Sequence, residues 1–319
     1  MQFDFAPMEG ITGSLYRRTH ARHFPGIHRY FIPFLEPRDG KCFDGHDQRE
    51  ISPAENEGVP VIPQMLTNRA DRFVEGARIL ADLGYAEVNL NLGCPARTVV
   101  THGRGAGFLA RPEELERFLD EIFAASPLPI SIKTRLGVEC ETEFDALLTL
   151  YRSYPLTELI VHARLLADQY TGPVRREIFA RALDGVPFPV CYNGDLFSRS
   201  ALERFQTEFP ETERVMLGRG LIANPGLVRE CQTGAPLTAA ELRDFHGDLL
   251  EGYRAQLSGG RNVLCWMKEL WFYWSCLYPD SRRAYKAIRK AQTLPAYWDA
   301  CEALLEREPV TEPGYQHSR

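Results

Sequence analysis

Polar and glycine residues follow most of the β-rich runs of this 319-residue chain. They include amides that both donate and accept hydrogen bonds, cations, and a thiol able to give up a proton. Functional groups of α/β barrels lie at the carboxyl ends of their strands, so these residues would meet at one mouth. In chain order they are Pro7-Met8-Glu9-Gly10, Gln64, Asn89, Asn91, Gly93-Cys94-Pro95, Lys133, Arg135, His162, Arg164, Asn193-Gly194-Asp195 and Gly218-Arg219-Gly220.

Two of these segments, 193–195 and 218–220, could bind a phosphate. In barrels the loops after the last two strands commonly do so through backbone N–H groups, and glycine permits the close approach. Arg219 would add a cation. Glycine also ends strands for steric reasons, so the pattern alone leaves both interpretations open. The segment Gly103-Arg104-Gly105-Ala106-Gly107 lacks the last glycine of a dinucleotide-binding motif.

The elements that must position these residues alternate between strand and helix, which predicts a (β/α)8 TIM barrel. Residues 34–58 hold Pro, Gly and charges, and we expect them to form a long loop over the barrel mouth. Helices are expected at 69–83, 112–125, 143–153, 175–183 and 198–207. Strands are expected at 3–6, 29–32, 61–65, 87–90, 129–133, 159–162, 190–193 and 214–217.

After Leu237 the pattern becomes purely helical, with segments at 238–257, 262–277 and 281–292. We therefore expect a catalytic barrel over 1–235, a small helical domain over 236–308 and a flexible tail over 309–319. Residues 281–298 contain five basic side chains and no acidic one. Arg282, Lys286, Arg289 and Lys290 fall on one helical face, which is typical either of a phosphate-contact surface or of a solvated helix.

Composition limits the classes of protein to which this chain could belong. The formal net charge of −6 argues against a protein that coats nucleic acid non-specifically, so any nucleic-acid site must be a local patch. The eight cysteines show neither C-x-x-C spacing nor accompanying histidine pairs, which argues against a zinc site; no metal is expected. The N-terminus does not resemble a signal peptide and no apolar run is long enough to span a membrane. We expect a cytoplasmic, monomeric protein.

The motifs occur together in the order typical of a known family. Over residues 6–225 the chain resembles the tRNA-dihydrouridine synthases. The resemblance implies an FMN-binding barrel with a helical tRNA-binding domain, which reduces uridines in tRNA to dihydrouridine with NADPH as reductant. It rests on Ala6-Pro7-Met8-Glu9-Gly10, Asn89-Leu90-Asn91-Leu92-Gly93-Cys94-Pro95, Gly103 to Leu109, Lys133-Thr134-Arg135-Leu136-Gly137, His162-Ala163-Arg164, Gln169-Tyr170-Thr171-Gly172, Asn193-Gly194-Asp195, Gly218-Arg219-Gly220 and Asn224-Pro225.

The same resemblance implies roles for individual residues. Cys94 matches the donor of a proton to C5 of uracil, and a thiol with a pKa near ~8.5 keeps its proton at neutral pH. The flavin would transfer hydride to C6. The cofactor would be bound by Pro7, Met8, Glu9, Gln64, Lys133, His162, Asn193, Gly194, Asp195, Gly218 and Arg219.

For the substrate, Asn91 is expected at the edge of the uracil, because an amide can pair with its donors and acceptors. Arg135, Arg164 and Tyr170 match positions that hold the target nucleotide and its neighbours, and the α-helical cations at 282–290 would contact the tRNA. The segment Val174-Arg175-Arg176 departs from the family pattern; its arginines either contact RNA or open a solvated helix.

Alternative functions remain open at this point. A related FMN barrel could reduce a free pyrimidine, as the dihydroorotate dehydrogenases do, although such a substrate needs no basic helical domain. A tRNA-binding protein without catalysis would not need Cys94, Lys133 and His162. An aldolase forming a Schiff base on Lys133 is a further option for a barrel. The tRNA position depends on how the helical domain orients the whole tRNA; the Pro7-Met8-Glu9-Gly10 opening is similar to that of the branch acting on position 16 of the D-loop, but does not by itself fix the position.

Overall fold

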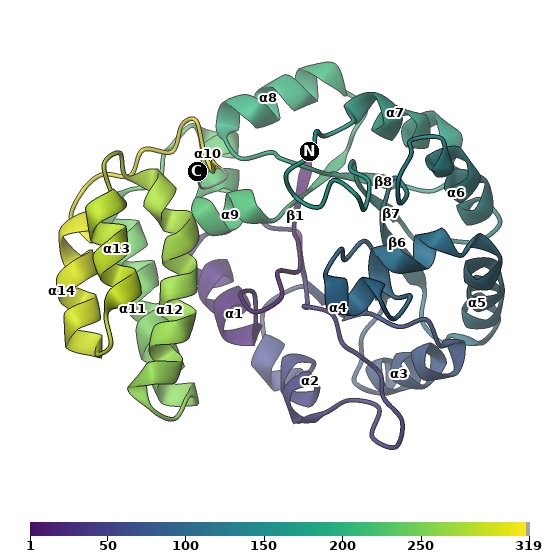
Figure 1. The fold of residues 1–319 in the computed structure, drawn as a ribbon, viewed down its shortest axis with the longest axis horizontal. Helices are drawn as coiled ribbons and strands as arrows, with labels where there is room; N and C mark the ends of the chain where they lie inside the picture. The colour runs from purple at the N-terminus through teal and green to yellow at the C-terminus, as the bar shows by residue number, and fades with distance from the viewer. Residues whose placement is uncertain (317–319) are drawn as a thin grey trace.

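The computed structural model describes residues 1–316, and its centre is a closed barrel of parallel strands surrounded by helices (Figure 1). The nine strands pair in the order β3-β2-β1-β9-β8-β7-β6-β5-β4. The two ends of this order, β3 (Val61–Ile62) and β4 (Gln64–Met65), are separated only by Pro63, which has no N–H for a ladder hydrogen bond. They are two halves of one strand, so the sheet closes on itself and the predicted TIM barrel is confirmed.

The other strands and the surrounding helices agree closely with the expected positions. Their bounds are β1 (Gln2–Phe5), β2 (Arg29–Phe31), β5 (Val88–Leu92), β6 (Ile130–Arg135), β7 (Leu159–His162), β8 (Val190–Asn193) and β9 (Arg214–Leu217). The helices are α1 (Ser14–His23), α2 (Gly45–Glu50), α3 (Ala70–Asp82), α4 (Arg97–Val100), α5 (Pro112–Ala125), α6 (Glu143–Tyr151), α7 (Arg176–Gly185), α8 (Arg199–Glu208), α9 (Arg219–Ala223) and α10 (Leu227–Thr233), with 3-10 turns at Ala54–Asn56 and Gly105–Ala110.

The segment 34–58 differs from the expected uninterrupted loop, because it contains α2 and the turn at Ala54–Asn56. The side chain of Asp44 accepts hydrogen bonds from the backbone N–H groups of His46 and Asp47 and so begins α2. The helix is only 6 residues long and largely polar, so it has too few apolar positions to produce a helical periodicity.

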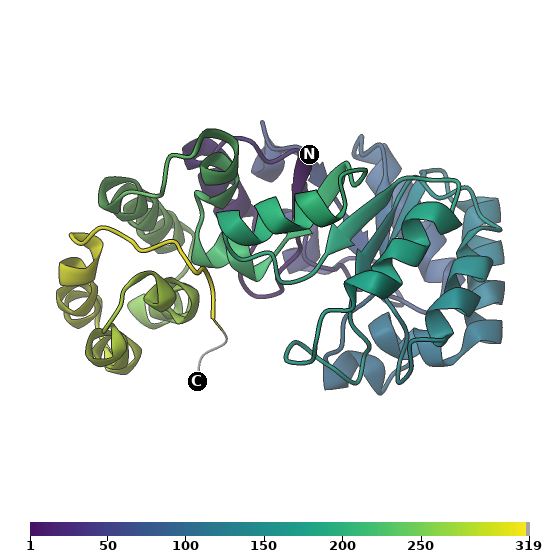
Figure 2. The same cartoon turned by 90° about the horizontal axis from the view of Figure 1, so that it is seen from above.

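The helical region consists of α11 (Ala239–Gln256), α12 (Gly260–Trp274), a 3-10 turn (Ser275–Leu277), α13 (Arg282–Lys290) and α14 (Leu294–Leu305). It lies beside the barrel, where α11 packs on α1 and α12 on α9 (Figure 2). The indole N–H of Trp274 donates to the carbonyl of Ile222 across this contact, 2.9 Å away. Helix α14 was not predicted, although Thr293 caps it and Pro295 stands in its first turn.

The C-terminal segment is packed rather than frayed, up to the end of the described residues. The backbone N–H of Val310 donates to the carbonyl of Leu277, and the hydroxyl of Thr311 donates to Glu230 in α10. Tyr315 is only 6% exposed. The expectation of a flexible tail from residue 309 is therefore wrong for 310–316; residues 317–319 lie outside the described part of the chain. Within residues 1–316, no helix combines the length and apolarity needed to cross a membrane.

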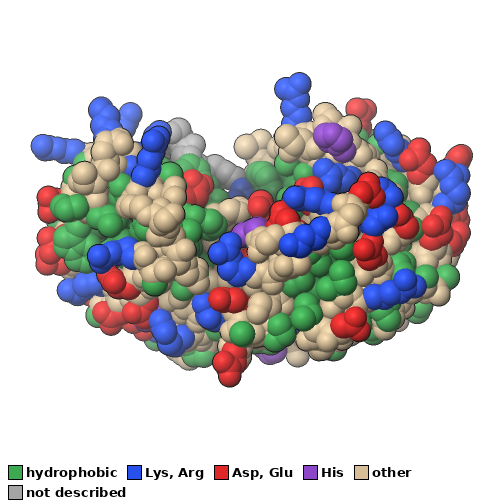
Figure 3. Space-filling model, turned by 90° about the horizontal axis from the view of Figure 1, so that it is seen from below, with side chains coloured by type: hydrophobic (Ala, Val, Ile, Leu, Met, Phe, Trp, Pro, Cys, Tyr) green, Lys and Arg blue, Asp and Glu red, His purple; other side chains and the backbone are tan. Residues whose placement is uncertain are grey.

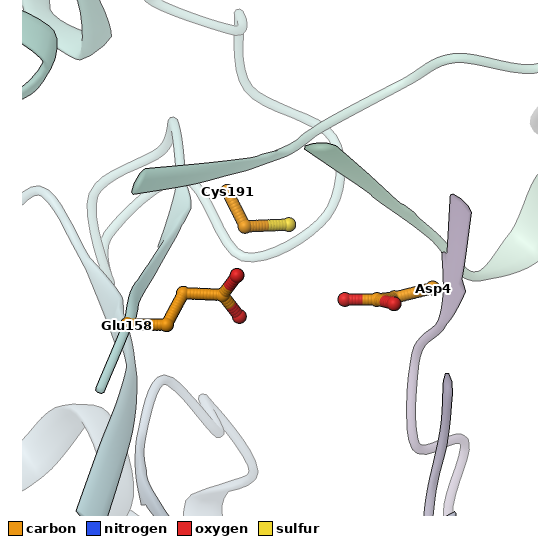
Figure 4. A group of neighbouring side chains, drawn as sticks. All are labelled: Asp4, Glu158 and Cys191. Carbon is orange, nitrogen blue, oxygen red and sulfur yellow. The ribbon is translucent and has the colours of Figure 1, made fainter. Parts of the chain in front are cut away.

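The amino-terminal end of the barrel contains a buried ion-pair cluster. Carboxylate and thiol atoms of Asp4, Glu158 and Cys191 lie within 4.8 Å of one another (Figure 4). Arg29 binds both carboxylates and Arg214 binds Glu158, with a distance of 2.6 Å from each guanidinium to Glu158. These guanidinium groups supply the positive charge that a buried carboxylate pair requires, and they join β1, β2 and β9 at this end of the barrel.

Replacing Arg29 with methionine should strongly destabilise the fold, because Asp4 and Glu158 would remain buried without this cation. We expect the free energy of unfolding to fall by about 3–5 kcal/mol, the usual effect of breaking a buried ion pair. Urea unfolding followed by circular dichroism measures the change. Arg22→Met is the control, since it breaks a pair with Asp248 whose side chains are 65% and 46% exposed. Equal effects of the two substitutions would contradict the assignment.

Candidate active site

A cavity of about 490 Å³ opens at the carboxyl ends of the strands. This volume lies within the range of about 300–1,000 Å³ typical of sites for small molecules and cofactors. The barrel therefore brings together most of the residues that the sequence singled out. Those lining the cavity are Pro7, Met8, Glu9, Gln64, Asn91, Cys94, Lys133, His162, Tyr170, Asn193, Gly194, Asp195, Gly218 and Arg219.

A chain of buried side-chain hydrogen bonds runs across adjacent strands toward the thiol. The amide of Asn89 donates to the hydroxyl of Ser131 at 2.8 Å, and Gln64 donates to Asn89 at 2.7 Å. Asn91 in turn donates to Gln64 at 2.7 Å, and its carbonyl oxygen accepts the backbone N–H of Cys94 at 2.9 Å. Asn91 therefore fixes the loop that carries Cys94, in addition to facing the cavity.

The loop of Cys94 is packed tightly from its other side. The carbonyl of Cys94 accepts a hydrogen bond from the backbone N–H of Ala106 at 3.0 Å. Gly105 has a φ of +54°, and a Cβ at this position would lie 2.8 Å from the same carbonyl oxygen, so only glycine fits. Burial raises the pKa of the Cys94 thiol, which therefore keeps its proton at neutral pH.

Lys133 and His162 form a region of the cavity that is poor in compensating negative charge. Burial, together with the neighbouring Arg135, lowers the pKa of Lys133 to about 8. Burial, together with the nearby cations Arg135 and Lys133, also lowers the pKa of His162 well below its ordinary value, so the imidazole is neutral at pH 7. An anionic ligand group placed beside Lys133 would raise its pKa again, stabilise its ammonium form and gain a direct charge interaction.

Arg135 and Arg164, expected to hold the substrate, do not line the cavity. Both are buried, at 0% and 1% exposure. Arg135 donates to the carbonyl of Gly93 at 2.8 Å and to that of Gln169 at 2.8 Å, and its guanidinium lies 5.3 Å from the ring of Tyr170. It therefore connects the loop before Cys94 with the loop of Tyr170, behind the cavity wall.

Arg164 belongs to a charged group centred on Asp195. Its guanidinium donates to both carboxylate oxygens of Asp195, one of them at 2.8 Å, and Arg219 donates to the same carboxylate at 2.6 Å. Among the described residues, two guanidinium groups thus surround one carboxylate, which gives this group a net positive charge beside Gly194 and Gly218. This is the charge that a phosphate in these loops would require.

The aromatic part of the cavity wall was missed by the sequence analysis. It consists of Phe34, Phe197, Phe272, Tyr273 and Tyr315. Phe272 and Tyr273 belong to α12 and line the cavity together with barrel residues, so they lie at the junction of the two regions. Tyr315 had no local signal, because its place depends on the path of the C-terminal segment.

The comparisons with known proteins agree with this geometry. The family model described as "Dihydrouridine synthase (Dus)" matches residues 4–254. The chain belongs to the dihydrouridine synthase family. It is therefore an oxidoreductase. The "tRNA-dihydrouridine(16) synthase" of Pseudomonas putida is 31% identical over 235 residues, which cover 71% of this chain and 72% of that protein. The protein of the same name from Aquipseudomonas alcaligenes is 27% identical over 307 residues, covering 92% and 96%.

Solved structures of low sequence identity support the fold alone. A morphinone reductase has a TM-score of 0.53 at 12% identity, with 74% of this chain and 86% of that chain covered. A variant of NCR from Zymomonas mobilis has a TM-score of 0.52 at 13% identity, with coverage of 74% and 88%. Both likenesses cover about as much of this chain as its barrel occupies.

The basic residues of α13 are Arg282, Arg283, Lys286, Arg289 and Lys290, and all are exposed. None has an ion-pair partner among residues 1–316. Figure 3 shows Lys and Arg side chains along the upper edge of the helical lobe, on the side where the surface between the two lobes is hollowed. This surface remains available for an anionic partner.

The arginines of the unusual segment 174–176 have partners within the protein instead. Arg175 pairs with Glu141 at 2.6 Å and with Asp168. Arg176 pairs with Glu208 at 2.8 Å and lies over the ring of Phe205. These contacts favour a role in holding the loop beside Tyr170, and they leave fewer donors for RNA.

The lowered pKa of Lys133 can be tested by its chemical reactivity. Its ammonium form should be half lost near pH 8, whereas an ordinary lysine, with a pKa of about 10.4, stays charged there. We expect an amine-acylating reagent to modify Lys133 increasingly between pH 7 and pH 9, as mapped by peptide mass spectrometry. Lys286, exposed on α13, is the internal comparison. A rise at Lys133 that begins only with that of Lys286 would disprove the shift.

Proposed function

We propose that this chain reduces the C5=C6 bond of specific uridines in tRNA to dihydrouridine, with FMN as cofactor and NADPH as reductant. The observation that carries the proposal is the joint presence of the Cys94 thiol and the Lys133 ammonium in one cavity of a dihydrouridine synthase barrel. The names of the relatives extend the proposal to uridine 16.

The residues of the cavity fit FMN. Gln64 and Lys133 offer an amide and a cation to the edge of a flavin ring, while Asp195, Arg164 and Arg219 form the positively charged group beside the glycine loops. A Cβ at Gly218 would lie 3.2 Å from the sulfur of Met8, so glycine allows the backbone after β9 to approach Met8 closely. Bound FMN supplies hydride chemistry at this position.

Within that site the protein's own groups control the proton and the charge. Cys94 holds a proton at its thiol, on a loop fixed by Asn91, and donates it to C5 of the uracil. Lys133 would contact the pyrimidine side of the cofactor and stabilise negative charge there, and its lowered pKa makes the gain from an anionic partner large. His162, being neutral, can donate a hydrogen bond without adding a further cation.

Tyr170 provides the surface on which the target base would stack, since its side chain is 46% exposed above the cavity. Arg135 and Arg164 act behind this surface as positioning residues. Arg135 joins the loop of Cys94 to the loop of Tyr170, and Arg164 binds Asp195, so these parts are already held in place before the nucleotide enters. Such pre-organisation reduces the ordering required when the substrate binds.

Replacing Cys94 with alanine tests the proton donor. The purified wild-type protein should be yellow with FMN and should form dihydrouridine in tRNA. The variant should keep FMN and tRNA binding but lose about 100-fold to 10,000-fold in turnover, the usual contribution of a positioned acid. Single-turnover assays with reduced enzyme measure the loss.

The matched control for this substitution is Cys231→Ala, which removes another half-buried thiol outside the cavity. It should retain wild-type turnover. Unchanged turnover of the Cys94 variant would refute the acid assignment. A colourless protein that takes up no FMN would refute the proposed function, and equal activity on free uracil would favour a reductase of free pyrimidines.

Helix α13 is proposed as a tRNA contact surface, and charge removal tests this. Replacing Lys286 and Lys290 with alanine should raise the KM for tRNA and leave kcat nearly unchanged, because these side chains are exposed and do not line the cavity. The slope of log affinity against log salt should fall by about 1–2 in magnitude. Arg78→Ala with Arg117→Ala, exposed on α3 and α5, is the control. Equal changes in both pairs would reject a specific surface.

A further inference from the structure

The C-terminal segment crosses from the helical region back to the barrel through a series of specific contacts. After α14, Val310 bonds to the turn that follows α12, and Thr311 bonds to Glu230 in α10 at 2.8 Å. Glu312 then accepts the backbone N–H of Ser200, in the first turn of α8, at 2.9 Å. Figure 1 shows this segment in yellow, running from α14 toward α9 and α10.

These contacts place Tyr315 in the wall of the cavity. Its ring lies 5.3 Å from that of Phe197, edge-on, and 5.4 Å from that of Tyr273. The guanidinium of Arg219 lies 5.9 Å from the ring of Tyr315, 5.1 Å from Phe197 and 5.2 Å from Tyr170. Arg219 is therefore held by aromatic faces as well as by Asp195, and Tyr315 is one of these faces.

The position of Tyr315 in the barrel decides which part of a ligand it would affect. Arg219 follows β9, and Cys94 follows β5; in the strand order of the sheet these are four places apart. In the closed barrel they face each other across the mouth. Tyr315 thus lies at the side of the glycine loops and the Asp195 group, away from the thiol that would serve the reacting carbon.

We propose that the C-terminal segment 310–316 completes the cofactor site, and that Tyr315 is a positioning residue which fixes Arg219 for binding the phosphate of FMN. This inference rests on the proposed function. A guanidinium confined between rings and a carboxylate loses little freedom when it binds an anion, so its contribution to affinity is larger than that of a mobile side chain. Tyr315 acts through Arg219 and has no part in the chemical step.

The experiment compares FMN with riboflavin, which lacks the phosphate, in the apoprotein. Flavin fluorescence quenching gives both dissociation constants for the wild type, Tyr315→Ala and Tyr315→Phe. Removing one of the aromatic rings around Arg219 should weaken the affinity for FMN about tenfold. The affinity for riboflavin should change by less than about twofold, because riboflavin has no phosphate for Arg219 to bind. Tyr315→Phe retains the ring and should restore FMN affinity.

Tyr154→Ala is the matched control. Tyr154 is 8% exposed and its ring stacks on that of Phe123, 5.0 Å away, but it does not line the cavity. It should lower the melting temperature as Tyr315→Ala does and leave both flavin affinities unchanged. The two substitutions thus separate a loss of folding stability from a loss of phosphate binding.

Other results would overturn the inference. Equal weakening of FMN and riboflavin in Tyr315→Ala would show a general structural effect, and unchanged FMN affinity with a raised KM for tRNA would place Tyr315 in the substrate site. Failure of the wild-type protein to bind FMN would instead reject the proposed function. The failure of each proposal therefore has a different signature.

Discussion

The closure of the parallel sheet at Pro63 is the constraint on which the rest of the structure depends. Because β3 and β4 are halves of one strand, every strand of the barrel has neighbours on both sides and all carboxyl ends meet around one opening. Residues separated by more than a hundred positions, such as Asn91 and Arg219, thereby line one cavity. No short-range contact in the chain could assemble this set.

The two ends of the barrel differ in how their charges are balanced. At the amino-terminal end, Arg29 and Arg214 are matched by the carboxylates of Asp4 and Glu158, so the cluster is neutral and structural. At the carboxyl end, within residues 1–316, the cations Lys133, Arg135, Arg164 and Arg219 outnumber Glu9 and Asp195, the two carboxylates that line the cavity. Low dielectric makes this imbalance costly unless an anion binds, which explains the lowered pKa of Lys133 and suits a phosphate-bearing ligand.

The helical region contributes to both halves of the proposed function. Its basic helix α13 is exposed on the side of the hollow between the lobes, while Phe272 and Tyr273 of α12 reach the cavity itself. The C-terminal segment then returns across α10 and α8 and brings Tyr315 against Arg219. Barrel, helical region and tail thus meet at this wall of the cavity, which the proposed cofactor and substrate sites would share.

The sequence by itself determined the barrel, the positions of its strands and most of the cavity residues, because buried parallel strands are short apolar runs and their ends carry polar or glycine residues. It also indicated the basic face of α13. Tertiary structure decided what local pattern cannot encode: that Arg135 and Arg164 turn behind the cavity, that the amide of Asn91 holds the Cys94 loop, and that Tyr315 reaches Arg219. The orientation of a long side chain and the path of a terminal segment depend on contacts between distant parts of the chain. The local sequence does not select among the alternative contacts, and only the assembled fold does.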